Sequence, residues 1–210
     1  MAPGPDGRQR RNCAAAFRAG DRFPALLLAA GASRRFNGCK ALARYSERAL
    51  IDHAIDQARH LSSDVRALTG CRAALLRWRA RHRPTSWLHT ELWTEGMSAS
   101  LKRGIDTLPA SAMGVFVVLV DQPLIGPEDL QRLRQTAMVQ PHKALAADYR
   151  GRPGAPAYLP RWLWPAIMAL EGDRGAGGLL QAARAQRLRL QGAREDVDTR
   201  DDLARLTTQR

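Results

Sequence analysis

The sequence predicts an α/β fold of three layers, with a mostly parallel sheet between two layers of helices. Short apolar segments with the length of buried strands alternate along the chain with longer segments whose apolar residues recur at helical spacing. Residues 114–120 are too uniformly apolar for a half-exposed strand, which indicates a place at the centre of the sheet. The sequence contains no internal repeat, and its length suits one domain over residues 23–210.

Five segments are predicted as strands of this sheet. Each is short and apolar, and each is bounded by turn residues or by a helical pattern. Because strands alternate with helices, successive strands are expected to run parallel. The predicted strands are residues 24–30, 64–69, 86–90, 114–120 and 143–149.

Helical spacing of apolar residues predicts the segments between the strands. The clearest apolar stripe runs from Leu50 to Leu61, within a helix predicted over residues 47–61. Pro127 marks the start of a later helix, because proline is favoured in the first helical turn. A Trp-rich helix is expected after Pro156, and a closing helix from about Arg200. The other predicted helices are residues 72–83, 97–108 and 128–139.

The chain is strongly basic, with a formal net charge of +13 that comes almost entirely from arginine. Lysine occurs only at Lys40, Lys102 and Lys143. The arginines are spread along the chain without a basic block interleaved with aromatic residues, so nucleic-acid binding is not expected. A positive field instead favours phosphorylated small molecules. No segment approaches the roughly 20 apolar residues that span a bilayer, which predicts a soluble protein without membrane contact.

Residues 1–22 are rich in proline, glycine and arginine and are predicted to form a disordered basic tail. The tail contains a twin arginine, but the apolar stretch that an export signal requires does not follow it. The three cysteines, Cys13, Cys39 and Cys71, have no C-x-x-C spacing, which argues against a disulfide framework or a structural zinc site. A cytoplasmic location is therefore predicted.

The segment after the first predicted strand has the composition of a phosphate-binding loop. Residues 29–33 are all small, so a ligand can approach the backbone closely and successive N–H groups can hold a phosphate or a base edge. Arg35 and Lys40 follow and can offset the charge of a triphosphate, arginine with paired hydrogen bonds and lysine as a compact charge. The spacing is neither that of the Walker P-loop nor that of G-x-G-x-x-G. A tight turn that binds no ligand is the alternative.

Asp121 follows the central strand at the edge where open sheets of this kind bind their ligands. One carboxylate together with phosphate oxygens is a usual way to hold Mg²⁺, and the ion stabilises charge as pyrophosphate leaves. A single aspartate at a strand end is otherwise a turn or helix cap. The metal interpretation depends on its combination with the first loop.

These motifs resemble the MobA-like nucleotidyltransferases. The loop reads L-A-A-G-x-S-x-R over residues 28–35, with Lys40 nine residues after the glycine. Its A-A-G form and the D-Q-P at residues 121–123 resemble the molybdenum cofactor cytidylyltransferase branch, whereas the guanylyl branch usually has L-A-G-G and D-M-P. The resemblance covers about residues 24–207 and implies a Rossmann-like, GT-A-like nucleotidyltransferase fold. One departure is Asn37, where the family usually has glycine, although asparagine tolerates the left-handed conformation.

By this resemblance, Arg35, Lys40 and Asp121 carry the catalysis. Residues 195–203 resemble an acidic ending of the family, which implies Asp198 as the second metal ligand, with Asp196 as the alternative. Thr199 and the acids beside it also suit the N-terminus of the closing helix, and both interpretations stay open. The implied nucleotide-binding residues are Leu28, Ala29, Ala30, Gly31, Ala32, Ser33, Arg35, Lys40 and Asp121.

Three further segments resemble the substrate side of the family: residues 96–101 (G-M-x-x-S-L), 151–156 (G-x-P-G-x-P) and 172–176 (G-D-x-G-A). We expect Ser98 to cap a helix whose N–H groups face an anion, and the two glycine-containing loops to wrap a pterin or phosphate. A bare helix start and plain surface turns are the alternatives. The implied substrate-binding residues are Gly96, Met97, Ser98, Ser100, Gly154, Asp173 and Gly175.

The resemblance implies a Mg²⁺-dependent attack by a substrate phosphate on the α-phosphorus of an NTP, with release of pyrophosphate. In the leading version CTP donates CMP to a molybdopterin-type substrate, the molybdopterin-bound molybdenum cofactor, and a molybdenum hydroxylase receives the product. One alternative is a related transferase that uses GTP or a sugar phosphate. Another is a non-catalytic chaperone that delivers the cofactor to a hydroxylase. A nucleic-acid-binding protein is the third alternative and rests on net charge alone.

Overall fold

The computed structural model describes residues 22–208, so the predicted tail lies outside the described residues except for Arg22. Seven strands form one sheet, in which β8 is antiparallel to β6 and β7 and all other pairs are parallel. The predicted mostly parallel α/β fold is thereby confirmed. The strands in sheet order are β5 (Ser86–His89), β4 (Val65–Thr69), β1 (Ala25–Ala29), β6 (Gly114–Leu119), β8 (Arg152–Pro160), β7 (Leu145–Tyr149) and β9 (Gln186–Leu188).

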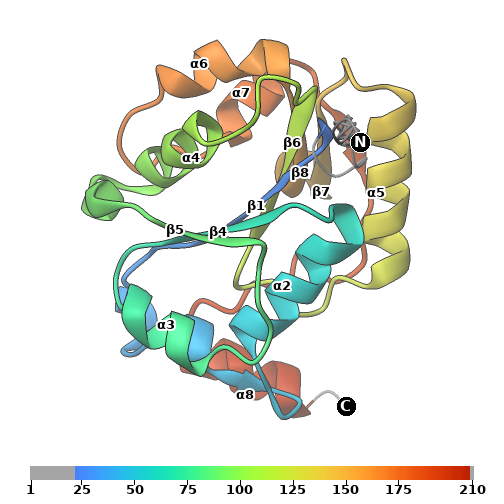
Figure 1. Cartoon of the computed structure of the whole chain (residues 1–210). Coiled ribbons are helices and arrows are strands. Elements are labelled where there is room, and N and C mark those ends of the chain that lie inside the picture. Colours follow the sequence, from blue (N-terminus) through green and yellow to red (C-terminus); the bar gives the residue numbers. More distant parts are fainter. Residues whose placement is uncertain (1–21, 209–210) are drawn as a thin grey trace, which may run out of the picture.

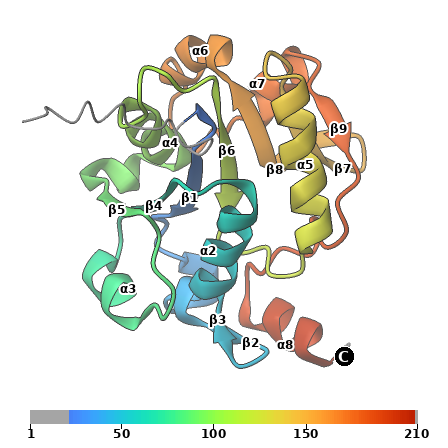
Figure 2. The same cartoon turned by 45° about the vertical axis from the view of Figure 1, so that its right-hand side comes forward.

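Helices cover both faces of the sheet, as Figures 1 and 2 show. Alternate residues of β1 belong to two separate cores: Leu27 packs with α2 and α5, while Leu26 and Leu28 pack with α4, α6 and α7. No helix within residues 22–208 has the length and apolar character needed to cross a membrane. The helices are α2 (Leu50–Leu61), α3 (Ala73–Arg79), α4 (Met97–Asp106), α5 (Pro127–Val139), α6 (Trp164–Met168), α7 (Gly177–Ala182) and α8 (Arg200–Thr208).

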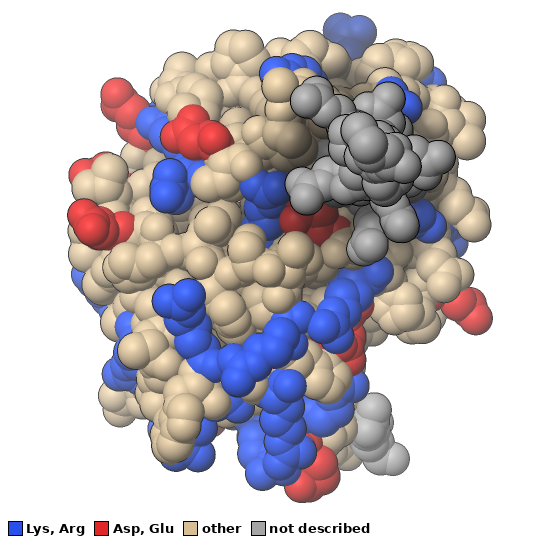
Figure 3. All heavy atoms as spheres, in the orientation of Figure 1, with Lys and Arg blue, Asp and Glu red and all other residues tan. Residues whose placement is uncertain are grey.

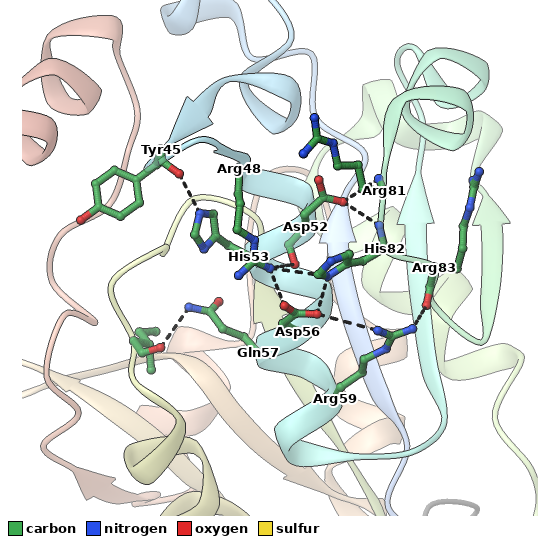
Figure 4. Close-up of polar contacts among 11 residues, drawn as sticks. Tyr45, Arg48, Asp52, His53, Asp56, Gln57, Arg59, Arg81, His82 and Arg83 are labelled. Carbon is green, nitrogen blue, oxygen red and sulfur yellow. Dashed lines mark hydrogen bonds and ion pairs between the residues drawn. The ribbon is translucent and has the colours of Figure 1, made fainter.

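Helix α3 is shorter than predicted, because the connector that follows it is bonded to α2 (Figure 4). Asp52 of α2 is buried, and its Oδ1 accepts the backbone N–H groups of Arg81 and His82 at 2.9 Å each. One turn later, Asp56 Oδ1 lies 2.6 Å from His82 Nδ1, and Arg48 donates to the other oxygen of Asp56. The backbone N–H groups of residues 81 and 82 therefore bond to a side chain of α2 instead of to helical carbonyl groups. The prediction of a helix over residues 72–83 is wrong in its last turn.

The expectation that residues 151–156 form a loop is wrong. Most of the segment belongs to β8, which pairs with β7 at residues 152–154 and 157–158 and with β6 at residues 157–160. Pro156 lacks an N–H group, but it falls where the register between β7 and β8 is interrupted, so no ladder hydrogen bond is lost there. The prolines of the segment are therefore compatible with a strand that is interrupted by a bulge.

The closing helix α8 begins where the sequence predicts, and it is capped. Thr199 Oγ1 accepts the N–H of Asp202 at 3.1 Å, and Asp202 Oδ2 accepts the N–H of Thr199 at 2.7 Å. This reciprocal pair satisfies two backbone donors that the first helical turn leaves free. The hydrogen bonds from Thr199 lower the pKa of Asp202 to about 2. The expectation that Thr199 caps the closing helix is thus confirmed.

Candidate active site

A cavity of about 390 Å³ opens at the carboxyl ends of β1, β4 and β6. Its volume lies in the range of small-molecule sites, and its position is the one expected for a ligand of an open α/β sheet. All nine predicted nucleotide-binding residues line this cavity, together with Asp198. The structure therefore brings together residues that are up to 170 positions apart in the sequence.

The first loop turns sharply at two residues that are not glycine. Ser33 and Asn37 both adopt the left-handed conformation, with φ angles of 54° and 50°, on either side of a short 3₁₀ helix (Arg34–Phe36). The buried ring of Phe36 fixes this helix against the core. Asparagine at position 37 thus adopts the conformation for which the family usually has glycine, as the sequence led us to expect.

Lys40 links the two predicted metal-binding carboxylates. Its Nζ lies 2.8 Å from Asp121 Oδ2 and 3.2 Å from Asp198 Oδ1. The Lys40 and Asp121 side chains are only 12% and 18% exposed, so their attraction is weakly screened by solvent. Arg35 reaches the other oxygen of Asp198 at 2.8 Å, but its side chain is 76% exposed and free to move to a ligand. Cations and anions therefore alternate along this end of the cavity.

The carboxylates of Asp121 and Asp198 have the chemistry that a divalent cation needs. Asp121 Oδ1 is buried, and among the described residues it has no hydrogen-bond partner. No group of three or more His, Cys, Asp and Glu side chains within residues 22–208 forms a metal cage. The two aspartates would thus leave the remaining coordination positions to substrate oxygens and water, which is how Mg²⁺ is usually held beside phosphates.

Asp196, the alternative metal ligand, makes a different contact. Its Oδ1 accepts a hydrogen bond of 3.0 Å from Nε2 of the buried Gln122, and it does not line the cavity. Gln122 Nε2 also donates to Ala155 O at 3.1 Å, while Gln57 donates to Gln122 O at 2.8 Å. Gln122 thus holds the loop that begins at Asp121 against the segment that contains Asp196.

Asp196 is an exposed residue, but partial desolvation of its carboxyl raises its pKa to about 6 from the ordinary 3.8. The hydrogen bond from Gln122 opposes this rise in pKa, and the charge of Asp121 adds to it. Because the folded state holds this proton more tightly than the unfolded chain, Asp196 contributes stability below pH 4 that is lost as pH rises through 6. We expect Asp196→Asn to gain stability relative to the wild type between pH 4.5 and 7.5. Urea denaturation at both pH values, with the exposed Glu195→Gln as the control, measures this; a difference that does not change with pH contradicts it.

On the substrate side, four of the seven predicted residues line the cavity: Gly96, Met97, Ser100 and Asp173. Gly96 has a φ of 106°, and a Cβ there would lie 2.5 Å from Asp173 Oδ1, so the close approach of these two segments requires glycine. Gly175 lies behind Met97, where a Cβ would come within 2.9 Å of the Met97 sulfur. The predicted segments 96–101 and 172–176 therefore form one wall of the cavity.

The other three predicted substrate-binding residues, Ser98, Gly154 and Gly175, do not line the cavity. Ser98 does not cap α4, because the N-cap position is Gly96 and Ser98 lies inside the helix. The Ser98 hydroxyl and N–H both donate to Gly172 O, at 2.7 and 3.3 Å. Gly154 does not line the cavity; it lies under the ring of Tyr149, 2.5 Å from where a Cβ would stand. Both residues thus support the site from outside the cavity.

Sequence reasoning missed several residues of the cavity wall. Four of them lie at the carboxyl ends of β4 and β5: Cys71, Arg72, Trp93 and Thr94. Each of them follows the last residue of its strand, Thr69 in β4 or His89 in β5, by at least two positions. The segments after β4 and β5 come together through tertiary packing, and no local sequence pattern reveals this contact.

The outer surface around the cavity is basic. Figure 3 shows lysine and arginine side chains gathered across the lower part of that face, in the region of α3 and α8 in Figure 1. Arg34, Arg35 and Arg72 line the cavity and are exposed. A positive surface at the entrance raises the local concentration of phosphorylated ligands.

A comparison with known protein families finds one match over residues 25–189, to the MobA-like NTP transferase domain. The chain belongs to the MobA-like NTP transferase family. The protein is accordingly a nucleotidyltransferase. The resemblance inferred from the sequence is confirmed at the level of the family. Among curated protein sequences, none matches the chain.

Solved structures show the same fold in several organisms. Rv0371c from Mycobacterium tuberculosis H37Rv is 26% identical, with a TM-score of 0.77 over 88% of this chain and 97% of that one. A manganese complex of Rv0371c gives 23% identity and a TM-score of 0.75 over 89% and 98% of the two chains. Molybdopterin-guanine dinucleotide biosynthesis protein A from Archaeoglobus fulgidus is 16% identical, with a TM-score of 0.63 over 88% and 96%. The last two likenesses concern the fold alone.

Proposed function

We propose that this nucleotidyltransferase transfers CMP from CTP to a molybdopterin-bound molybdenum cofactor and releases pyrophosphate. The observation that carries the proposal is the position of Lys40 between Asp121 and Asp198, at the end of the Ala29-Ala30-Gly31 loop. One part-buried cation and two carboxylates suit the binding of a triphosphate together with a divalent cation.

The residues of the chain act by position and charge. The backbone N–H groups of the small-residue loop and the side chains of Arg35 and Lys40 would bind the triphosphate. Held in this way, the α-phosphorus faces an attacking phosphate of the acceptor, and the same cations stabilise the charge that develops on the leaving pyrophosphate. No covalent bond to the protein is needed.

Asp121 and Asp198 would hold Mg²⁺ in this scheme. The bound ion neutralises the phosphate oxygens and stabilises charge in the transition state. The free acceptor oxygen of Asp121 supports the assignment, as does the manganese complex of Rv0371c. Mg²⁺ is proposed because carboxylate and phosphate oxygens are the hard ligands that it prefers; Mn²⁺ suits the same ligands and can replace it as a probe.

The choice of CTP rests on the Ala29-Ala30-Gly31 sequence, and the choice of acceptor on the wall formed by Gly96, Met97 and Asp173. The Ala29-Ala30-Gly31 motif resembles the cytidylyltransferase branch, and the motifs that contain Gly96, Met97 and Asp173 resemble the substrate side of the family. The similarity in fold to a molybdopterin-guanine dinucleotide biosynthesis protein agrees with a molybdopterin-type acceptor. A molybdenum hydroxylase is the proposed recipient of the product.

Pyrophosphate release measured with each of the four NTPs, Mg²⁺ and molybdenum cofactor tests the proposal. We expect CTP to be used at least about tenfold faster than GTP, since differences in base contacts of about 1–3 kcal/mol are typical of such discrimination. Equal rates with all four NTPs would remove the assignment to CTP. Turnover that requires a sugar phosphate in place of the molybdenum cofactor would assign the protein to a different substrate class.

A further inference from the structure

The two ends of the cavity differ in charge. What we infer from this difference rests on the proposed binding of an NTP. Lys40, Asp121 and Asp198 lie on the side of β6, where a triphosphate and its metal ion would be neutralised. The nucleobase carries no charge, so it is not drawn to this end. On the side of β4 and β5, the wall includes Cys71, Trp93 and Thr94, next to the exposed Arg72. A nucleotide bound along the cavity would place its base there.

Trp93 is held tightly against the end of β4. A Cβ at Gly70 would lie 2.4 Å from both Cβ and Cγ of Trp93 and 2.8 Å from Ala30 O, so the absence of a side chain at Gly70 is what admits the tryptophan. Cys71 N donates to Ala30 O at 3.1 Å and joins the ends of β4 and β1. Trp93 is thereby packed next to Ala30 of the first loop.

The indole of Trp93 is not buried in the hydrophobic core. Trp93 is half-buried and lines the cavity, whereas Trp164 is 8% exposed and belongs to one of the two core clusters. No hydrogen bond or ring contact of the Trp93 side chain is present among the described residues, apart from its packing on Gly70. A rigid aromatic surface fixed at one edge and open on the cavity side is what a planar ligand needs for stacking.

We propose that Trp93 forms the wall on which the nucleobase of the NTP stacks. Stacking accepts the π-face of any base, so Trp93 contributes affinity for nucleotides over plain polyphosphates, while the first loop chooses between bases. The contact between Gly70 and Trp93 sets the distance of this wall from Ala30. The first loop and Trp93 then enclose the base from two sides.

Calorimetric titration of CTP and of inorganic tripolyphosphate, each with Mg²⁺, tests the proposal. The arginines and Lys40 contact the phosphates of both ligands, so the difference in affinity between CTP and tripolyphosphate reports the contribution of the nucleoside. We expect Trp93→Ala to weaken CTP binding about tenfold and tripolyphosphate binding less than twofold. Trp78→Ala is the matched control, because Trp78 is 72% exposed on α3 and does not line the cavity; we expect no change for either ligand.

Trp93→Phe provides a second readout that does not depend on how Trp93→Ala folds. Phenylalanine keeps an aromatic face, so CTP affinity is expected to stay within about threefold of the wild type. We expect CTP to quench tryptophan emission in the wild type, and we expect this quenching to disappear in Trp93→Phe, although four tryptophans remain. Quenching that persists in Trp93→Phe, or an equal loss for both ligands in Trp93→Ala, overturns the proposal. If the wild-type protein binds no NTP more tightly than it binds tripolyphosphate, the proposed function is overturned as well. This result distinguishes failure of the proposed function from failure of the Trp93 proposal alone.

Discussion

Asp121→Asn is expected to reduce pyrophosphate release by roughly 10²–10³-fold, which is the usual loss when one group that stabilises transition-state charge is removed. The substitution keeps the size of the side chain but removes its negative charge. Asp121 lies 2.8 Å from Lys40, and its second oxygen is buried without a hydrogen-bond partner among the described residues. The loss should therefore appear in kcat at saturating CTP, and excess Mg²⁺ should restore only part of it.

The matched control is Asp148→Asn. Asp148 also lies near the end of a strand of the same sheet and pairs with Arg194 at 3.3 Å, but it does not line the cavity. Its substitution is expected to leave the rate within about twofold of the wild type, as for most substitutions outside a functional site. If Asp121→Asn delivers molybdenum cofactor to a hydroxylase in full and without NTP turnover, the protein is a chaperone rather than a catalyst.

Lys40→Gln is expected to change activity and metal binding in opposite directions. Pyrophosphate release should fall about 10²-fold, because a cation that neutralises the triphosphate is lost. In the absence of nucleotide, the affinity for Mn²⁺ should rise at least about tenfold. The physical reason is that Lys40 bridges Asp121 and Asp198 and competes with a divalent cation for both carboxylates.

Titration of Mn²⁺ by electron paramagnetic resonance, together with the pyrophosphate assay, measures both effects. Lys143→Gln removes the same charge from an exposed position outside the cavity and serves as the control, with both quantities expected to stay unchanged. Weaker Mn²⁺ binding in Lys40→Gln would show that Asp121 and Asp198 do not form the metal site. Unchanged turnover would show that Lys40 does not contact the triphosphate.

The sequence was informative wherever one local pattern had one physical meaning. The apolar run over residues 114–120 could bury its side chains only inside a sheet, and it forms the inner strand β6. The left-handed conformation at Asn37 followed from its tolerance of positive φ. Pro127 marked the first residue of α5 because proline suits the first helical turn.

Errors arose where partners distant in the sequence decided the outcome. The end of α3 depends on Asp52 and Asp56, which lie on another helix and bind the backbone and side chain that follow. Residues 152–154 became part of a strand because β7 pairs with them, while β6 pairs with the following residues 157–160 of the same strand. This pairing offset the usual preference of proline and glycine for turns. Neither partner can be identified from the segment itself.

For the candidate site, the sequence by itself determined the chemical groups: a small-residue loop, two cations and two carboxylates in a fixed order along the chain. Their types and spacing follow from what a triphosphate and a divalent cation require. The tertiary structure alone decided that Asp198 rather than Asp196 meets Lys40, and that Trp93 joins the cavity wall. It also decided that Ser98, Gly154 and Gly175 stay outside the cavity. These outcomes depend on distances between strand ends that the packing of the whole sheet sets, and packing is a property of no single segment.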